Sequence, residues 1–281
     1  MNFWVSSDLD GTLIDHHTYS FSSALSAIAL CKENNVPILL NTSKTYSETE
    51  KIHQQLGLDT PLIIENGSAI VLPSSMPLAG SEYGSSILKG ERHHIRFGAP
   101  RSEILKFLSQ VRTQTDFKFE GFNDWTPNQV SDQTGLNLSD SKLALMKEYS
   151  EPFIWQDSER HFDKFESMSL KAGFKVLKGG RFFHLMGNTD KAKPLQWLRS
   201  NAGLLFPGLS SSASSPALIC LGDSQNDIAM LNVADVPVCV RSPVSPYPKV
   251  TTSKDVVYTK KYGPEGWAEA INAILPNQTR T

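Results

Sequence analysis

Short apolar runs that end in polar residues divide the N-terminal part of the chain. Three of these runs are predicted to be buried strands: residues 3–5, 36–40 and 62–64. Apolar side chains at helical spacing predict a helix over residues 22–34, between the first two strands. Thr45 and Glu48 form a capping-box pattern that predicts the start of a second helix. Strands that alternate with helices in this way predict a parallel sheet with crossover helices.

The pattern changes between residues 85 and 186, where strand and helix signals no longer alternate regularly. Threonine followed by proline at 126–127 predicts the start of one helix, and a hairpin is predicted around residues 178–180. This mixture is typical of an α+β domain. The alternation of helices and strands then returns. We therefore predict an α/β protein in which residues 1–84 and 187–281 form a parallel-sheet core and residues 85–186 form an inserted α+β domain.

The composition excludes several classes of protein. The chain has 281 residues, and its 27 basic and 29 acidic side chains give a net charge of −2, which argues against a nucleic-acid partner held by phosphate neutralisation. No apolar stretch approaches the roughly 20 residues that span a bilayer, and residues 1–8 become polar too soon for a signal peptide, so we expect a cytoplasmic protein with no membrane partner. The three cysteines have no metal-ligand spacing and are expected to be buried thiols.

Two carboxylates directly after the first predicted strand indicate a functional site. Asp8 and Asp10 are two residues apart, and side chains two apart in an extended chain point the same way. Gly11 permits a sharp turn beside them. Two carboxylates that face one site repel each other, and a hard divalent cation removes that repulsion. The pattern therefore favours a metal site that also accepts phosphate oxygens.

A second group of acids follows a strand predicted after the insertion. Asp223, Asn226 and Asp227 lie at i, i+3 and i+4, so one helical turn would gather them. The second predicted strand ends at residues 41–44, and Lys191 begins the helix that follows the insertion. Because ligands of open parallel sheets bind at the carboxyl ends of strands, we expect these acids, hydroxyls and lysines at one edge of the sheet.

With these motifs the chain resembles the haloacid dehalogenase superfamily and, more narrowly, the mannosyl-3-phosphoglycerate phosphatases. The segments that carry the narrower resemblance are spread over nearly the whole chain: residues 7–13, 42–45, 65–67, 180–184 and 263–267. The resemblance implies a Rossmann-like core with an inserted α+β cap of the second type. That fold agrees with the insertion predicted from the hydrophobic pattern.

The resemblance also implies a mechanism. Asp8 attacks phosphorus and becomes an aspartyl phosphate, while Asp10 protonates the leaving oxygen and then deprotonates the attacking water. Thr42 and Lys191 neutralise the phosphoryl oxygens as charge builds up. Mg²⁺ is expected to bind Asp8, the carbonyl of Asp10 and Asp223. Asn226 and Asp227 are expected to support these metal ligands from outside.

The implied substrate is a small phosphorylated sugar acid, a mannosyl- or glucosyl-3-phosphoglycerate. The residues expected to contact it are Ser43, Lys44, Glu65, Asn66, Gly67 and Arg181. Arg181, on the predicted hairpin, is the leading candidate for the glycerate carboxylate because a guanidinium can bind a carboxylate through two hydrogen bonds. A solvated hairpin arginine is the alternative interpretation.

Several alternatives stay open. The second motif reads Thr-Ser-Lys, so Thr42 or Ser43 can contact the phosphate, and we favour Thr42. Lys193 competes with Lys191, which we favour because it lies six residues before Trp197, as in relatives. The same chemistry could act on a sucrose-type or hexose phosphate, or could transfer the phosphoryl group to another sugar. A non-catalytic sugar-phosphate sensor is the alternative from another class.

Overall fold

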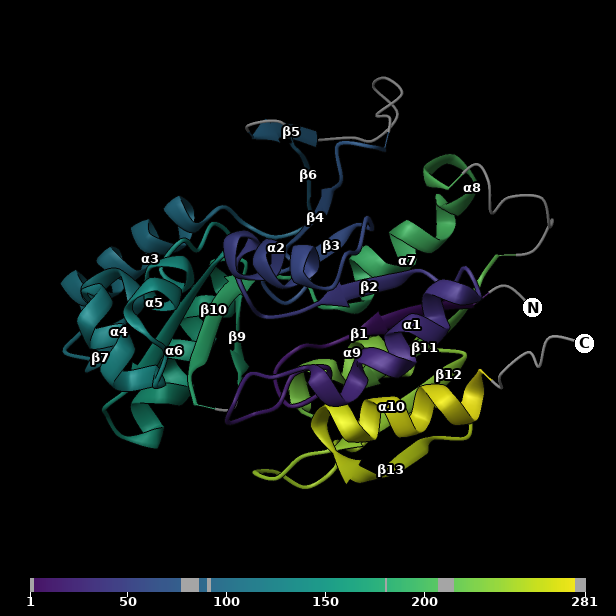
Figure 1. Ribbon diagram of the computed structural model, residues 1–281. Helices are drawn as coiled ribbons and strands as arrows, with labels where there is room; N and C mark the ends of the chain where they lie inside the picture. Colours follow the sequence, from purple (N-terminus) through teal and green to yellow (C-terminus); the bar gives the residue numbers. More distant parts are fainter. Residues whose placement is uncertain (1–2, 77–85, 90–91, 180, 207–214, 276–281) are drawn as a thin grey trace, which may run out of the picture.

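The computed structural model describes residues 3–76, 86–89, 92–179, 181–206 and 215–275, which form a larger sheet and a smaller one (Figure 1). The larger sheet has the strand order β13-β12-β11-β1-β2-β3-β4-β6-β5. Its strands are β1 (Phe3–Ser7), β2 (Ile38–Asn41), β3 (Leu62–Ile64), β4 (Ala69–Leu72), β5 (Ser86–Lys89), β6 (Arg92–Arg96), β11 (Ala217–Gly222), β12 (Val236–Arg241) and β13 (Val257–Tyr262).

The predicted parallel core is confirmed. β1 pairs in parallel with both β2 and β11, and the parallel pairing continues to β3 on one side and β13 on the other. The sequence analysis did not predict that β4, β5 and β6 extend this sheet as an antiparallel edge. The reversal occurs at residues 65–67, where Glu65, Asn66 and Gly67 all have positive φ angles and turn β3 directly into β4.

Helices cover both faces of the larger sheet. They are η1 (Ser22–Ala24), α1 (Leu25–Glu33), α2 (Tyr46–Gln55), α7 (Ala192–Ser200), α8 (Ala202–Leu205), η4 (Gln225–Asp227), α9 (Ile228–Asn232) and α10 (Gly263–Ile274). Because successive strand residues face opposite sides, Val5 packs in one core with α1 and α10, whereas Trp4 packs in another with α7 and α9. The predicted capping box at Thr45 and Glu48 starts α2.

The smaller sheet has the order β7-β8-β10-β9 and is antiparallel throughout. Its strands and the helices around it are β7 (Phe119–Gly121), β8 (Ser150–Trp155), β9 (Phe174–Lys178), β10 (Phe183–Gly187), α3 (Arg101–Gln114), η3 (Phe122–Asp124), α4 (Pro127–Thr134), α5 (Leu138–Ala144) and α6 (Glu159–Lys171). Apolar side chains of α3 and α6 pack on one face of the sheet. We call residues 98–187 the cap.

The predicted boundary between residues 84 and 85 lies outside the described residues, as does Gly180 of the predicted hairpin. β5 and β6 pair with β4 in the larger sheet, so strand pairing favours a first boundary after β6, and the division of the chain stays a proposal. The three cysteines are buried and free, as predicted. Among the helices that the structure describes, none combines the length and the apolar character needed to cross a membrane.

Candidate active site

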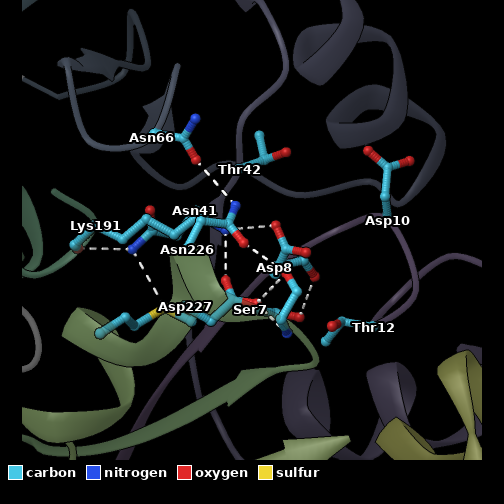
Figure 2. A network of polar contacts seen from close by, with 12 residues as sticks. Ser7, Asp8, Asp10, Thr12, Asn41, Thr42, Asn66, Lys191, Asn226 and Asp227 are labelled. Carbon is cyan, nitrogen blue, oxygen red and sulfur yellow. Dashed lines mark hydrogen bonds and ion pairs between the residues drawn. The ribbon is translucent and has the colours of Figure 1, made fainter. Parts of the chain in front are cut away.

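Three parallel strands bring the candidate nucleophile to the edge of the larger sheet. Asp8 follows β1 directly, and its N–H donates to the carbonyl of Leu221 on β11 (3.0 Å). Asp8 is buried, with 5% of the residue exposed. Figure 2 shows the polar side chains that surround it at this strand end. The position is the one expected for a ligand site in an open parallel sheet.

Three carboxylates meet at this edge. Asp8, Asp223 and Asp227 are all buried, and each offers an oxygen that lies within 4.8 Å of the other two. Burial raises the pKa of Asp8 well above its usual range; Lys191 opposes the shift, and the other two carboxylates add to it. Burial and the charge of Asp227 raise the pKa of Asp223 to about 7. A hard divalent cation fits this oxygen-rich donor set and would relieve the repulsion within it.

Two glycines allow the segments that carry these acids to approach closely. A Cβ at Gly11 would lie 2.6 Å from Oδ2 of Asp223, and Gly11 has a φ of +77°. A Cβ at Gly222 would lie 2.4 Å from Cβ of Asp227. Oδ2 of Asp227 accepts hydrogen bonds from the N–H groups of Asp223 and Ser224, both at 3.1 Å. The carboxylate of Asp227 is therefore held in one orientation by its own turn.

The lysine at the start of α7 lies within the carboxylate cluster. Lys191 is fully buried, and its Nζ donates to Oδ1 of Asp8 and to Oδ1 of Asp227, both at 2.6 Å (Figure 2). Burial alone would lower the pKa of Lys191, but the charges of Asp227 and Asp8 outweigh it and raise the pKa. Lys193, the alternative lysine, is exposed and donates to the carbonyl of Asn188 (2.6 Å). The structure thus places Lys191, and not Lys193, at the cluster.

Asn226 does not join the three carboxylates. Its Nδ2 donates to Oδ1 of Asn66 (3.0 Å), and its own Oδ1 accepts from the hydroxyl of Ser224 (2.5 Å). Asn66 is 1% exposed, and its Nδ2 has no hydrogen-bond partner among the described residues. The two amides therefore form one side of the site, next to Lys191 (Figure 2).

The side chain of Asp10 lies apart from the carboxylate cluster (Figure 2). Lys44 Nζ lies 3.0 Å from Oδ2 of Asp10 and 3.6 Å from Oε1 of Glu48. Burial alone would lower the pKa of Lys44, but these two carboxylates raise it. The geometry leaves the Asp10 carboxyl free of the three clustered acids, as a separate proton carrier requires. A metal contact through the Asp10 carbonyl stays a prediction.

The loop between β2 and α2, residues 42–45, connects the site with the cap. Thr42 is fully buried, and its Oγ1 accepts from the N–H of Lys44 (3.2 Å). The carbonyl of Ser43 accepts from Nζ of Lys147, a buried cap residue (2.7 Å). The structure places both Thr42 and Ser43 near the site, so the choice of phosphate contact between them remains a prediction.

Glu65 and Gly67 have structural partners. The carboxylate of Glu65 accepts from the N–H groups of Glu148 and Tyr149 (2.8 and 3.2 Å) and from the hydroxyl of Ser150 (2.6 Å), so it binds the cap to the core. Burial raises its pKa, and Lys147 opposes that shift. A Cβ at Gly67 would lie 2.0 Å from the carbonyl oxygen of Asp190, so only glycine allows this approach. Their predicted substrate contacts stay predictions.

Arg181 is exposed on the cap, and its guanidinium donates to the carbonyl of Gln133. Its charge lowers the pKa of the Tyr19 hydroxyl, against the larger effect of burial, which raises it. The predicted carboxylate contact of Arg181 stays a prediction.

Some residues whose role the sequence analysis did not predict form hydrogen bonds to the segments that carry Asp8 and Lys191. Nδ2 of Asn41, at the end of β2, donates to the carbonyl of Lys191 (2.9 Å). Nε1 of Trp267 donates to the Ser7 hydroxyl (3.0 Å), which donates to the carbonyl of Asp8 (2.7 Å). Asn41 precedes the second motif and Trp267 closes the GPEGW segment, so proximity to these motifs was the available signal. Lys147 lies next to no motif.

Comparisons with known proteins show which family the chain belongs to. A family model described as haloacid dehalogenase-like hydrolase matches residues 5–83. A protein of Methanococcoides burtonii named glucosyl-3-phosphoglycerate/mannosyl-3-phosphoglycerate phosphatase is 36% identical over 280 residues, 98% of each chain. A protein of Persephonella marina with the same name is 33% identical over 272 residues, 95% of each chain.

Solved structures show the same fold at low sequence identity. A phosphatase of the haloalkanoate (HAD) superfamily from Bacteroides thetaiotaomicron aligns with a TM-score of 0.63 at 18% identity, covering 98% of this chain and 95% of that one. The sucrose-phosphatase of Synechocystis aligns with a TM-score of 0.60 at 15% identity, covering 98% of each chain. These likenesses cover both sheets.

Proposed function

Because this chain belongs to the haloacid dehalogenase-like hydrolases and, among them, to the family of the glucosyl-3-phosphoglycerate/mannosyl-3-phosphoglycerate phosphatases, we propose that it hydrolyses a glycosyl-3-phosphoglycerate to the glycosylglycerate and phosphate. The observation that carries the chemistry is the meeting of Asp8, Asp223 and Asp227 with Lys191 at one strand end. A nucleophilic carboxylate, a group of cation ligands and a fixed ammonium are what phosphoryl transfer requires.

The nucleophile is Asp8. One of its carboxylate oxygens attacks phosphorus, the ester oxygen leaves, and an aspartyl phosphate forms. Lys191 donates to Oδ1 of Asp8, which fixes the carboxylate and favours its ionised form against the effect of burial. Asp8 and Asp223, with Asp227 beside them, would hold Mg²⁺, which supplies positive charge for the phosphoryl oxygens when bound. The hydroxyl of Thr42 and the ammonium of Lys191 bind the same oxygens.

The proton carrier is Asp10. Its carboxyl gives a proton to the leaving oxygen, so the sugar acid departs as a neutral alcohol group. It then takes a proton from water, which attacks phosphorus and breaks the bond to Asp8. Lys44, at 3.0 Å from Asp10, holds this carboxyl away from the clustered acids. One water is consumed, and the products are the glycosylglycerate and inorganic phosphate.

A substrate panel tests the proposal. Phosphate release is measured from mannosyl- and glucosyl-3-phosphoglycerate, 3-phosphoglycerate, sucrose 6-phosphate and mannose 6-phosphate, each with Mg²⁺ and with excess chelator. We expect the highest kcat/KM on a glycosyl-3-phosphoglycerate and no release with chelator. Equal rates on all five compounds would contradict the substrate assignment. Label that appears on a sugar acceptor instead of in free phosphate would indicate a phosphotransferase.

A further inference from the structure

Tyr19 has a backbone conformation that a bulky residue rarely adopts. Its φ is +56°, in the left-handed region, where an L side chain is strained. The loop that holds it is built around Asp15: Oδ1 accepts from the N–H groups of His17 and Thr18 (3.0 and 2.8 Å), and the Asp15 N–H donates to the carbonyl of Ser20 (2.8 Å). Strain that is maintained by dedicated hydrogen bonds points to a function for the side chain it presents.

The ring of Tyr19 lies on the Asp10 side of the site. Lys44 Nζ is 5.5 Å from the centroid of the ring and 3.0 Å from Oδ2 of Asp10. The ring is therefore separated from the proposed proton carrier by one ammonium. Tyr19 is nevertheless 40% exposed, so part of its surface stays available to a ligand.

Charged groups of the core and the cap shift the pKa of this tyrosine. Burial raises the pKa of the Tyr19 hydroxyl; Asp10 and Glu48 act in the same direction, and Lys44 and Arg181 oppose them. Arg181 belongs to the cap. Asp10, Lys44 and Glu48 belong to the core, in loops and a helix that follow strands of the larger sheet. Tyr19 consequently lies beside the ammonium of Lys44, a cation that suits a carboxylate.

We propose that the ring of Tyr19 is the surface on which the sugar of the leaving group packs, which makes it a specificity-determining residue; this inference rests on the proposed function. The ester oxygen that leaves Asp8-bound phosphorus must lie near Asp10, which protonates it. The sugar is joined to that oxygen by a three-carbon glycerate and so extends past Asp10 toward Tyr19. The C–H face of a hexose packs on an aromatic ring, and the glycerate carboxylate meets Lys44 and Arg181.

Two variants separate the ring from the backbone. Tyr19→Gly removes the ring and also relieves the positive φ, so its thermal unfolding midpoint should equal or exceed that of the native protein. Tyr19→Phe keeps the ring and removes the hydroxyl. The readout is kcat/KM for mannosyl- and glucosyl-3-phosphoglycerate, set against 3-phosphoglycerate, which lacks the sugar.

For Tyr19→Gly we expect kcat/KM on the glycosylated substrates to fall about 10- to 100-fold, mainly through KM, the scale for losing one buried aromatic contact. Activity on 3-phosphoglycerate should stay within about twofold, because phosphate binding and chemistry are untouched. Tyr19→Phe should stay within about threefold on all substrates. Equal losses on both kinds of substrate, no loss, or an equal loss in Tyr19→Phe would each overturn the inference.

The outcome is independent of which sugar ester the enzyme prefers. If the native enzyme hydrolyses hexose phosphates but no glycosyl-3-phosphoglycerate, the proposed function fails. The two substrates to compare are then mannose 6-phosphate and glycerol phosphate, which lacks a sugar. If Tyr19→Gly then lowers kcat/KM on the sugar ester alone, the proposed packing of the sugar on the Tyr19 ring is still supported. A measurement without turnover is saturation transfer from aromatic protons to mannosylglycerate, which should weaken in Tyr19→Gly but not in Tyr19→Phe; unchanged transfer in both would overturn the inference.

Discussion

Replacing Lys191 by methionine tests the electrostatic balance of the site. The ammonium is fully buried between Asp8 and Asp227, and a third carboxylate, Asp223, lies with them. One ammonium cannot balance three carboxylates, but a divalent cation adds the two positive charges that make the group neutral. Lys191→Met keeps most of the side-chain volume and removes one of those charges. Two carboxylates then lose a hydrogen bond of 2.6 Å each.

The expected size of the effect follows from the burial. Removing one partner from a buried ion pair costs about 3–5 kcal/mol, because the remaining charge is left uncompensated. That amount is a large fraction of the 5–15 kcal/mol that stabilises a typical folded domain. In the proposed mechanism the same ammonium binds the phosphoryl oxygens, and losing one fixed electrostatic contact of this kind lowers kcat roughly 10²- to 10³-fold.

Urea unfolding and steady-state kinetics, each over a range of Mg²⁺ concentrations, measure both effects. We expect the loss of kcat in Lys191→Met to persist at saturating Mg²⁺, because a bound cation does not replace the missing ammonium. Lys193→Met is the matched control, since that lysine is exposed and its Nζ donates to the carbonyl of Asn188, away from the carboxylate cluster. It should stay within about 0.5 kcal/mol and twofold of the native protein. Full recovery of Lys191→Met by Mg²⁺, or an equal loss in Lys193→Met, would refute the reasoning.

Three further predictions concern the cap, a glycine and the cation. Lys147→Met removes the buried ammonium that holds the β2–α2 loop and should lower kcat about tenfold on every phosphomonoester. Lys51→Met, the control, breaks an outer ion pair between core and cap and should leave kcat unchanged. Equal kinetics in the two variants would contradict this prediction. Gly67→Ala should lower the free energy of unfolding by about 2–4 kcal/mol. Gly135 has a similar φ but open space around it, so Gly135→Ala should lower the free energy of unfolding by only about 1 kcal/mol. Equal losses of unfolding free energy, measured by urea unfolding, would exclude the steric argument. Because burial raises the pKa of Asp223 to about 7, metal-free stability should fall as pH rises toward that value, and Mg²⁺ should raise the unfolding midpoint more at about pH 8 than at about pH 6. An increase of the unfolding midpoint by Mg²⁺ that is equal at both pH values would contradict this prediction.

The parallel core was predictable because its strands are short apolar runs separated by helices. The antiparallel edge was missed because β4 begins right after the turn at residues 65–67, and no local signal distinguishes a strand that reverses there from one that crosses over. Asp8 and Asp223 could be paired from sequence because both follow strands that lie side by side in a parallel sheet.

Other roles depend on contacts between residues that are far apart in the chain. Glu65 was predicted to contact the substrate, and its carboxylate accepts hydrogen bonds from residues 148–150 of the cap, which no local sequence signal indicates. Lys147 reaches the β2–α2 loop from a segment without a motif. The strained backbone of Tyr19 follows from the loop around Asp15 and has no signature in hydrophobic periodicity. The contacts of Glu65 and Lys147 become visible only when the cap is placed on the core.

The central claim is that Asp8 is the nucleophile of a phosphatase. The most direct measurement is phosphate release from mannosyl-3-phosphoglycerate at saturating Mg²⁺ by the native enzyme and by Asp8→Asn, which keeps the shape of the side chain. The account predicts that the native enzyme releases one phosphate per substrate and that Asp8→Asn is slower by roughly a thousandfold or more, the scale for loss of a covalent nucleophile. Release by Asp8→Asn within about tenfold of the native rate would contradict it.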